Sequence, residues 1–226
     1  TALRNVNFEI KPGEKMAIIG KTAAGKSTIA DLLLRFYDAS EGRILIDGKD
    51  IREHNLYSLR EQVAYVPQNV FLFSDTIENN IKFGFGEASP ERVKTYAGHA
   101  AIRNDIEGLP KSFHTMVGER GVTLSGGQKQ RVSIARALIN DPEIVILDDC
   151  LSAIDANTEH RIMEYFNDAL KDKTAIIITH RISSLFEFDK ILVLEEGTIA
   201  DIGTHETLVE KEGYYKELLR MQYEES

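Results

Sequence analysis

Four short apolar runs recur along the chain, and longer stretches with helical periodicity separate them. The runs are Met16–Ile19, Ile144–Leu147, Ala175–Ile178 and Ile191–Leu194. Continuous apolar runs of this length, rich in β-branched residues, are typical of strands buried on both faces of a parallel sheet. Because helical stretches lie between them, the pattern predicts βα repeats and an α/β fold with a parallel-sheet core.

Other segments give weaker but distinct signals. Residues Leu3–Ile10 alternate between apolar and polar, which predicts a half-buried strand. Arg43–Ile46 and Val63–Val66 predict two further strands, ended by Asp47-Gly48 and by Pro67 respectively. Ile29–Phe36 predicts a helix after the first apolar run, and Tyr214–Tyr223 predicts an amphipathic helix near the end of the chain.

The pattern changes between Phe71 and about Gly121, where short helical pieces and polar residues replace the strands. We expect one domain over residues 1–226, with an α-helical subdomain at about residues 71–140 inserted into the core. The sequence shows no internal repeat and no low-complexity segment.

The loop after the first apolar run matches the pattern G-x-x-x-x-G-K-[ST], the P-loop. Backbone N–H groups of such a loop bind phosphate oxygens, and the following helix adds its positive N-terminal end. Lys26 would reach the β- and γ-phosphates, and the Ser27 hydroxyl would bind Mg²⁺. The predicted nucleotide-binding residues are Gly20, Lys21, Thr22, Ala23, Ala24, Gly25, Lys26, Ser27 and Thr28.

Composition narrows the function further. The chain has 226 residues, of which 42% are hydrophobic, and a formal net charge of −9. A nucleic-acid surface needs a basic face, so we expect no nucleic-acid partner. The single cysteine, Cys150, excludes a disulfide framework. No apolar run approaches the length of a membrane span, so membrane association would come through a partner or another segment.

A second motif follows about a hundred residues after the P-loop. Ser125 and Gln128 fit the S-x-x-Q capping box at the start of a predicted helix, and Gly126 and Gly127 leave first-turn N–H groups open to an outside anion. The same string alone would be an ordinary helix start. Together with the P-loop, it makes the chain resemble the ATP-binding cassette (ABC) family over essentially its whole length.

That resemblance implies a P-loop NTPase fold with a parallel-sheet core, an antiparallel β part and an inserted helical subdomain. It also implies that the signature motif contacts ATP bound to a second cassette in a head-to-tail dimer. The signature residues are Leu124, Ser125, Gly126, Gly127 and Gln128.

An acidic pair follows the apolar run Ile144–Leu147. Asp148, at the end of a buried strand, would hold Mg²⁺ through its waters. The family has glutamate at the next position, as the general base for the attacking water, and this chain has Asp149. Because misplacing a base by about 1 Å can lower the rate about a hundredfold, we expect this site to bind ATP but hydrolyse it slowly. In the family, such a change is typical of the degenerate-site half of a heterodimeric bacterial multidrug or lipid exporter.

Three more motifs match the family in order. Gln68 matches the Q-loop residue that reaches Mg²⁺ and the water, and His180 matches the switch histidine that contacts the γ-phosphate. Ser152 and Asp155 match the D-loop at the dimer interface. The predicted catalytic residues are therefore Asp149, His180 and Gln68, and the predicted metal ligands are Ser27, Gln68 and Asp148.

Two departures and one missing element accompany these matches. Ala23 stands where the family usually has glycine, which would strain a backbone with positive φ. Val117–Gly121 resembles the exporter loop that touches the membrane domain, but Met116 replaces its usual acid. The adenine-stacking aromatic and its strand normally precede Thr1, so we expect a fragment of a longer polypeptide with membrane helices upstream.

The resemblance implies an ABC exporter ATPase with ATP and Mg²⁺ as cofactors. Its partners would be a transmembrane domain and a second nucleotide-binding domain, in a homodimer or, as Asp149 favours, a heterodimer at the cytoplasmic face of the membrane. Two alternatives remain open: a purely regulatory ATP-binding half, and a non-transport ABC protein of DNA repair or translation. An ABC protein of DNA repair would carry a long coiled-coil insertion between the P-loop and the signature. An ABC protein of translation would carry two cassettes with basic linkers.

Overall fold

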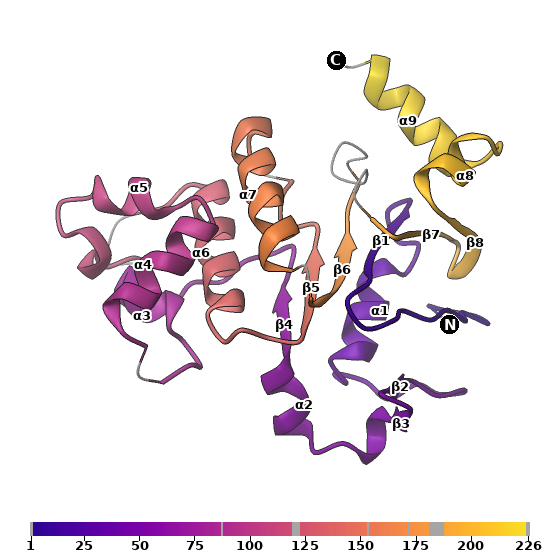
Figure 1. Ribbon diagram of the computed structural model, residues 1–226, viewed down its shortest axis with the longest axis horizontal. Helices are drawn as coiled ribbons and strands as arrows, with labels where there is room; N and C mark the ends of the chain where they lie inside the picture. Colours follow the sequence, from indigo (N-terminus) through magenta and orange to yellow (C-terminus); the bar gives the residue numbers. More distant parts are fainter. Residues whose placement is uncertain are drawn as a thin grey trace. The chain divides into compact units, whose positions relative to one another are not determined.

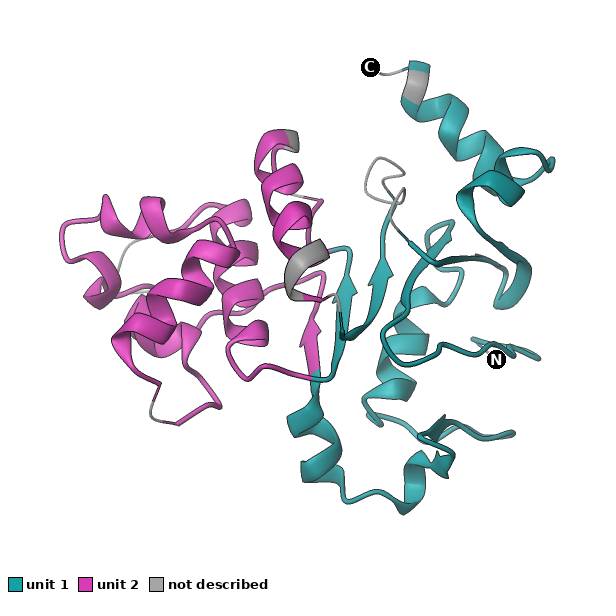
Figure 2. Cartoon of the chain, in the orientation of Figure 1, with its two compact units in different colours: residues 1–63, 143–149, 172–226 teal, residues 64–142, 150–171 magenta. Residues whose placement is uncertain are grey.

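The computed structural model describes residues 2–86, 88–118, 123–152, 154–170, 172–180 and 188–224. The chain divides into two units, coloured separately in Figure 2. Unit 1 comprises residues 1–63, 143–149 and 172–226, and unit 2 comprises residues 64–142 and 150–171.

The sheet of unit 1 has the strand order β5-β6-β1-β7-β8 (Figure 1). The first four strands pair in parallel, and β7 and β8 pair antiparallel. The bounds are β1 Lys15–Gly20, β5 Ile144–Asp148, β6 Thr174–Ile178, β7 Lys190–Glu195 and β8 Thr198–Gly203. The predicted α/β fold with a parallel-sheet core and an antiparallel part is confirmed.

The core of unit 1 lies on this sheet because its central strands are apolar on both faces. Met16 to Ile19 of β1 have no exposed surface, and Val145 and Ile146 of β5 have none either. Their main-chain groups bond to neighbouring strands, so complete burial leaves no ladder group unpaired.

The remaining elements of unit 1 are mostly short. A small antiparallel pair, β2 and β3, stands apart from the main sheet. The bounds are α1 Lys26–Leu33, β2 Leu45–Ile46, β3 Lys49–Asp50, the 3₁₀ turn η1 Ile51–Glu53, α2 Leu56–Gln62, α8 His205–Val209 and α9 Tyr214–Glu224. The helix predicted over Ile29–Phe36 begins earlier and ends at Leu33, since Arg35 has a left-handed φ of 51°.

Unit 2 is mainly helical. Strand β4 crosses from Val63 into it, and the signature helix α6 contacts both α3 and α4. The bounds are β4 Val63–Val66, α3 Ile77–Ile81, α4 Pro90–His99, α5 Arg103–Glu107, the 3₁₀ turn η2 Ser112–His114, α6 Gly126–Leu138 and α7 Ala156–Ala169. The assignment of residues 71–140 as an inserted subdomain stays a prediction.

Half-buried arginines connect separate segments of unit 2 through hydrogen bonds to main-chain oxygens. The Arg136 guanidinium of α6 donates to the main-chain oxygens of Asn80 and Phe71, and the guanidinium of Arg92 donates twice to the oxygen of Ile139. A guanidinium has five donors, so each arginine can bond main-chain oxygens of another segment of unit 2.

The strand predicted over Leu3–Ile10 is wrong. Leu3, Val6 and Phe8 are half-buried between exposed neighbours, so the alternation itself is present. The main chain, however, does not pair in a ladder: Arg4 N–H donates to Gly197 O, and Glu9 O accepts from the Lys190 ammonium. Alternation reports a half-buried extended segment, and strand assignment needs a hydrogen-bonded partner as well.

Two further strands differ from the sequence prediction. The strand expected at Arg43–Ile46 is reduced to Leu45–Ile46, and β8 was not predicted at all. Strand β8 alternates in burial at the edge of the sheet, which is the pattern of a one-sided strand rather than of the buried runs.

Candidate functional site

The P-loop joins the end of β1 to the start of α1, as the motif requires. A Cβ atom on Gly20 would lie 2.2 Å from the main-chain oxygen of Leu194, so only glycine fits there. Gly25, with φ 103°, is the N-cap of α1 and gives no side-chain cap bond. The first turn of α1 therefore presents its N–H groups toward the loop, as a phosphate-binding helix start does.

Lys26 is the first residue of α1 and is only 7% exposed. Its ammonium donates to the main-chain oxygens of Gly20, at 2.8 Å, and of Lys21, at 3.0 Å. Burial lowers the pKa of Lys26, and the nearby carboxylates of Asp149 and Asp148 act in the opposite direction. An ammonium has three donors, so two bonds to the loop leave one donor for a third acceptor.

Ala23 has a φ of 66°, in the left-handed region. The sequence predicts strain at Ala23 if its φ is positive, and in the structure φ is positive. An L-residue with a Cβ is disfavoured there by about 1–2 kcal/mol, and glycine is not. The loop thus keeps a glycine-like backbone at a position occupied by alanine.

Asp148 and Asp149 follow β5 at the carboxyl edge of the parallel strands. Asp148 is the last residue of the strand and is 4% exposed. Asp149 has a left-handed φ of 46°, and its N–H donates to the oxygen of Ile178 at 2.8 Å. The backbone of Asp149 is thus fixed to β6, one residue beyond the strand.

His180 stands two residues after β6, at the same edge of the sheet. Its pKa is lowered by burial and by the positive charge of Lys26, while Asp149 and Asp148 raise it. The neutral imidazole, which can donate from one nitrogen and accept at the other, is therefore favoured near neutral pH. Unit 1 thus brings together Lys26, both carboxylates and the histidine.

The signature motif lies in unit 2, at the start of α6. Ser125 Oγ accepts from the N–H of Gln128 at 3.2 Å, and Gln128 Oε1 accepts from the N–H of Ser125 at 3.0 Å. This is the predicted capping box, with both bonds present. Ser125 and Gly126 are exposed, whereas Leu124 is buried and anchors the turn.

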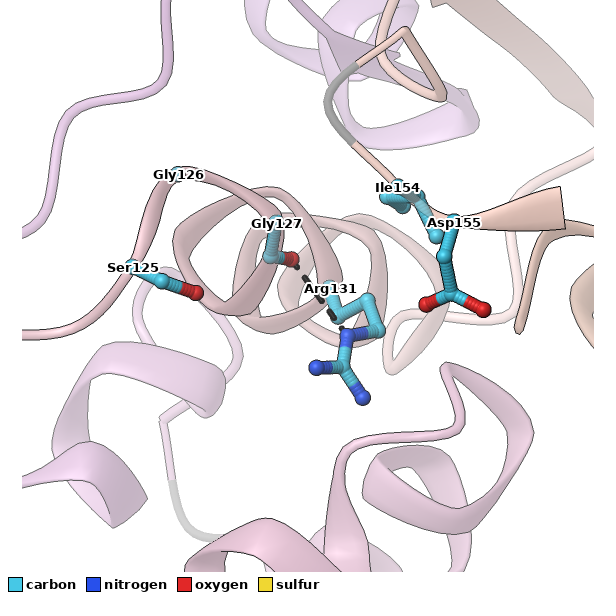
Figure 3. A pocket seen from close by; sticks show the side chains of 6 residues that line it. All are labelled: Ser125, Gly126, Gly127, Arg131, Ile154 and Asp155. Carbon is cyan, nitrogen blue, oxygen red and sulfur yellow. Dashed lines mark hydrogen bonds between the residues drawn. The ribbon is translucent and has the colours of Figure 1, made fainter. Parts of the chain in front are cut away.

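A hollow of about 340 Å³ lies beside this motif in unit 2 (Figure 3). It is lined by Ser125, Gly126, Gly127, Arg131, Ile154 and Asp155. Asp155, which the sequence predicts as a D-loop residue, is the N-cap of α7 and accepts from Thr158 N–H at 3.0 Å. Its pKa is lowered, first by that backbone bond and in smaller part by the charge of Arg131.

Arg131 is a lining residue that the sequence reasoning missed. Its guanidinium donates to the oxygen of Ala101 at 2.6 Å and pairs with Asp105 at 2.7 Å. A third, longer bond of 3.4 Å reaches Gly127 O, the dashed line in Figure 3. Arg131 lies four residues, about one helical turn, after Gly127 of the signature, and that spacing is the signal that could have identified it.

The other predicted residues are distributed between the units. Gln68 follows β4 in unit 2 with an exposed side chain, and Ser152 is also exposed there. Ser27 is exposed in the first turn of α1. Glu119–Gly121 of the exporter-type loop, together with Ala153 and Arg181, lie outside the described residues.

Residues 3–152 match the protein-family model described as ABC transporter. The chain belongs to this family.

Three similar curated proteins are ATP-dependent lipid A-core flippases. The chain is 46% identical over 223 residues to the ATP-dependent lipid A-core flippase of Escherichia coli (strain K12), covering 98% of this chain and 38% of that protein. The flippase of Photobacterium profundum is 44% identical, with the same coverage of both chains. The flippase of Hahella chejuensis is 43% identical over 226 residues, covering 100% of this chain and 39% of that protein. The chain thus spans less than half the length of these relatives.

Among solved structures, a bacterial Atm1-family ABC exporter with ATP bound is similar over 98% of this chain and 39% of its own. The TM-score is 0.95 and the sequence identity 45%. In the part of the chain that the structure describes, no helix is both long and apolar enough to cross a membrane.

Proposed function

We propose that this chain is the nucleotide-binding domain of an ABC exporter, and that it binds and hydrolyses MgATP. One observation carries the proposal: unit 1 gathers the P-loop lysine, a buried strand-end aspartate and a half-buried histidine at one edge of its sheet. A cation for the phosphates, an acid for the metal and a polar group for the γ-phosphate are the parts that phosphoryl transfer to water requires.

The donor set suits Mg²⁺ carried by ATP. In unit 1, Ser27 offers a hydroxyl and Asp148 a carboxylate, both of them hard oxygen ligands. Gln68, in unit 2, stays a predicted ligand through its amide oxygen. Mg²⁺ is usually held by one or two carboxylates together with substrate phosphates, and it keeps several waters. When bound, the ion neutralises charge that develops on the phosphate oxygens.

We assign the signature motif to the ATP of a second nucleotide-binding domain. The capping box satisfies Ser125 and Gln128 within the chain, and the exposed turn at Gly126 offers its N–H groups to a molecule outside it. A head-to-tail dimer uses both halves of the chain at two shared sites. The solved relative is an ABC exporter with ATP bound, which supports the nucleotide but not a particular pairing.

Asp149 supports a slow site in this chain and a heterodimer with a faster partner. Its backbone N–H is bonded to Ile178 O, so the main chain is not free to advance and replace the missing methylene. The shorter carboxylate then stays back from the water that it would orient. If hydrolysis at this site is too slow to contribute to turnover, the chain is a purely regulatory ATP-binding half.

Transport and location follow from the relatives as proposals. The curated relatives are ATP-dependent lipid A-core flippases more than twice as long as the matched segment. We therefore propose a transmembrane domain as the second partner, at the cytoplasmic face of the membrane, with ATP binding and hydrolysis coupled to substrate export.

The proposal is tested by the metal dependence of hydrolysis in the natural full-length protein. Asp148→Asn removes the strand-end charge, and with the partner's catalytic base disabled we expect MgATP hydrolysis at this site to fall at least about tenfold. Asp172→Asn is the matched control, since Asp172 is an exposed aspartate just before β6 in the same unit. If both variants hydrolyse MgATP as fast as wild type, the assignment of Asp148 is wrong.

A further inference from the structure

Helix α9 has one buried face, and that face ends at a polar residue. Tyr215 and Leu219 are 3% and 6% exposed, and Gln222 continues the series three residues later. Spacings of four and three residues place all three on the same side of a helix. Met221, 57% exposed, points away from it. Gln222 is thus directed toward the body of unit 1 rather than toward solvent.

The start of α9 contacts other parts of unit 1 at two points. The hydroxyl of Tyr215 lies 2.5 Å from Nδ1 of His205 in α8, which precedes α9 in Figure 1. The ammonium of Lys21, a P-loop residue, lies 5.8 Å from the ring centre of Tyr214. A cation over an aromatic face is attracted by the ring, so the first turn of α9 lies beside the phosphate-binding loop.

The end of α9 reaches the switch histidine. Nε2 of Gln222 donates to the main-chain oxygen of His180 at 2.6 Å. The partner is a carbonyl oxygen, which only accepts, so the group facing it must be the amide NH₂. The preceding residue is fixed as well, because Thr179 N–H donates to Ile18 O.

We propose that Gln222 is a positioning residue that holds His180 in the orientation needed at the γ-phosphate. The inference rests on the proposed function and assigns a partner to one residue of that site. Fixing the carbonyl of a residue restricts its ψ, and the backbone sets the direction of the Cα–Cβ bond. Gln222 therefore restrains the imidazole without touching the nucleotide.

Three substitutions separate this role from simple packing. Gln222→Leu keeps most of the volume and removes the donor. Gln222→Glu presents an ionised carboxylate, which has no donor for the carbonyl. Gln222→Lys restores a donor on a longer stem. Met221→Ala is the matched control on the exposed side of the same helix.

With the partner's catalytic base disabled so that only this site reports, we expect single-turnover hydrolysis in the full-length protein to fall about three- to tenfold in Gln222→Leu and Gln222→Glu. The Kd for ATP should change less than about twofold, and Gln222→Lys should recover most of the rate. Met221→Ala should match wild type. Loss of rate in Gln222→Lys equal to that in Gln222→Leu would overturn the proposal.

A double-mutant cycle with His180→Ala gives the decisive result. The carbonyl of residue 180 remains in that background, so a merely structural bond would still matter. A positioning role acts through the imidazole, and Gln222→Leu should then change the rate no further. An undiminished effect of Gln222→Leu in the His180→Ala background contradicts the inference.

The same experiment distinguishes the inference from the proposed function. If His180→Ala and Asp148→Asn slow hydrolysis while the Gln222 variants do not, the inference alone is wrong. If none of these variants slows hydrolysis, the proposed site itself is wrong.

Discussion

The P-loop region of unit 1 and the signature region of unit 2 both begin a helix at a glycine-bearing turn, but they cap it differently. Helix α1 has Gly25 as its N-cap and receives no side-chain cap bond. Helix α6 has a complete capping box between Ser125 and Gln128. No side chain caps the first turn of α1, which suits the binding of an outside anion, whereas side chains of the chain itself cap the start of α6.

The two regions also differ in whether their charged and polar side chains are buried or exposed. Lys26 and Asp148 are buried in unit 1, where Lys26 bonds to the loop. In unit 2, Asp155 and Ser125 are exposed around an open hollow. Burying charges is unfavourable unless they are paired or used, so unit 1 has the character of a binding site for its own ligand. Unit 2 has the character of a surface that meets another molecule.

The largest expected effect is on turnover at Asp149. Asp149→Glu adds the methylene that the general base lacks, and we expect own-site hydrolysis to rise by up to about a hundredfold. Asp149→Asn should change the rate little, because little base catalysis remains to be lost. Single-turnover hydrolysis in the assembled dimer measures this, with the partner's catalytic base disabled so that only this site reports.

The opposite pattern would overturn the slow-site interpretation. If wild type is already fast and Asp149→Asn abolishes hydrolysis, Asp149 is a competent base. A symmetric homodimer would then be the better interpretation.

A smaller effect is expected on affinity. Lys26→Ala removes the cation that meets the β- and γ-phosphates, and a hydrogen bond to a charged group is worth about 1.5–3 kcal/mol. ATP binding should weaken at least about tenfold in a fluorescent-nucleotide titration. Lys49→Ala is the control, since Lys49 is an exposed lysine of unit 1 outside the phosphate-binding loop. Equal affinities of Lys26→Ala and wild type would contradict the P-loop assignment.

The next effect concerns the stability of the loop. Ala23 has a left-handed φ of 66°, so Ala23→Gly should relieve strain and stabilise the fold by about 0.5–1 kcal/mol after the extra unfolded-chain entropy of glycine. Ala24→Gly is the control: Ala24 is buried and outside the left-handed region, so glycine there should destabilise. Urea denaturation measures both, and destabilisation by Ala23→Gly would show that the strain is absent.

The comparison also explains what the sequence could predict. Residues Ile144–Leu147 and Ala175–Ile178 predicted their strands almost to the residue, because continuous burial on both faces leaves a continuous apolar run. The capping box at Ser125 was predicted because its two partners are three residues apart. Signals of this kind are local and depend on few residues.

Long-range contacts were not predictable in the same way. The segment Leu3–Ile10 alternates like a strand, but whether a partner pairs with it depends on residues far along the chain. Gln222 in an amphipathic helix has the sequence signature of a solvated residue, and its carbonyl partner lies 42 positions away. The left-handed φ at Asp149 is equally invisible in the sequence. The roles of the predicted site residues stay predictions until the variants are measured.

We propose that the P-loop binds this chain's own ATP and that the signature contacts ATP bound to a second molecule. Ser125→Arg tests it most directly, because it places a bulky cation where the second molecule's γ-phosphate would dock. We expect the ATP affinity of the monomer to stay within about threefold of wild type, a change of about 0.6 kcal/mol, while ATP-driven dimerisation falls. A large loss of monomer affinity, comparable to that of Lys26→Ala, would contradict it and assign the signature to this chain's own site.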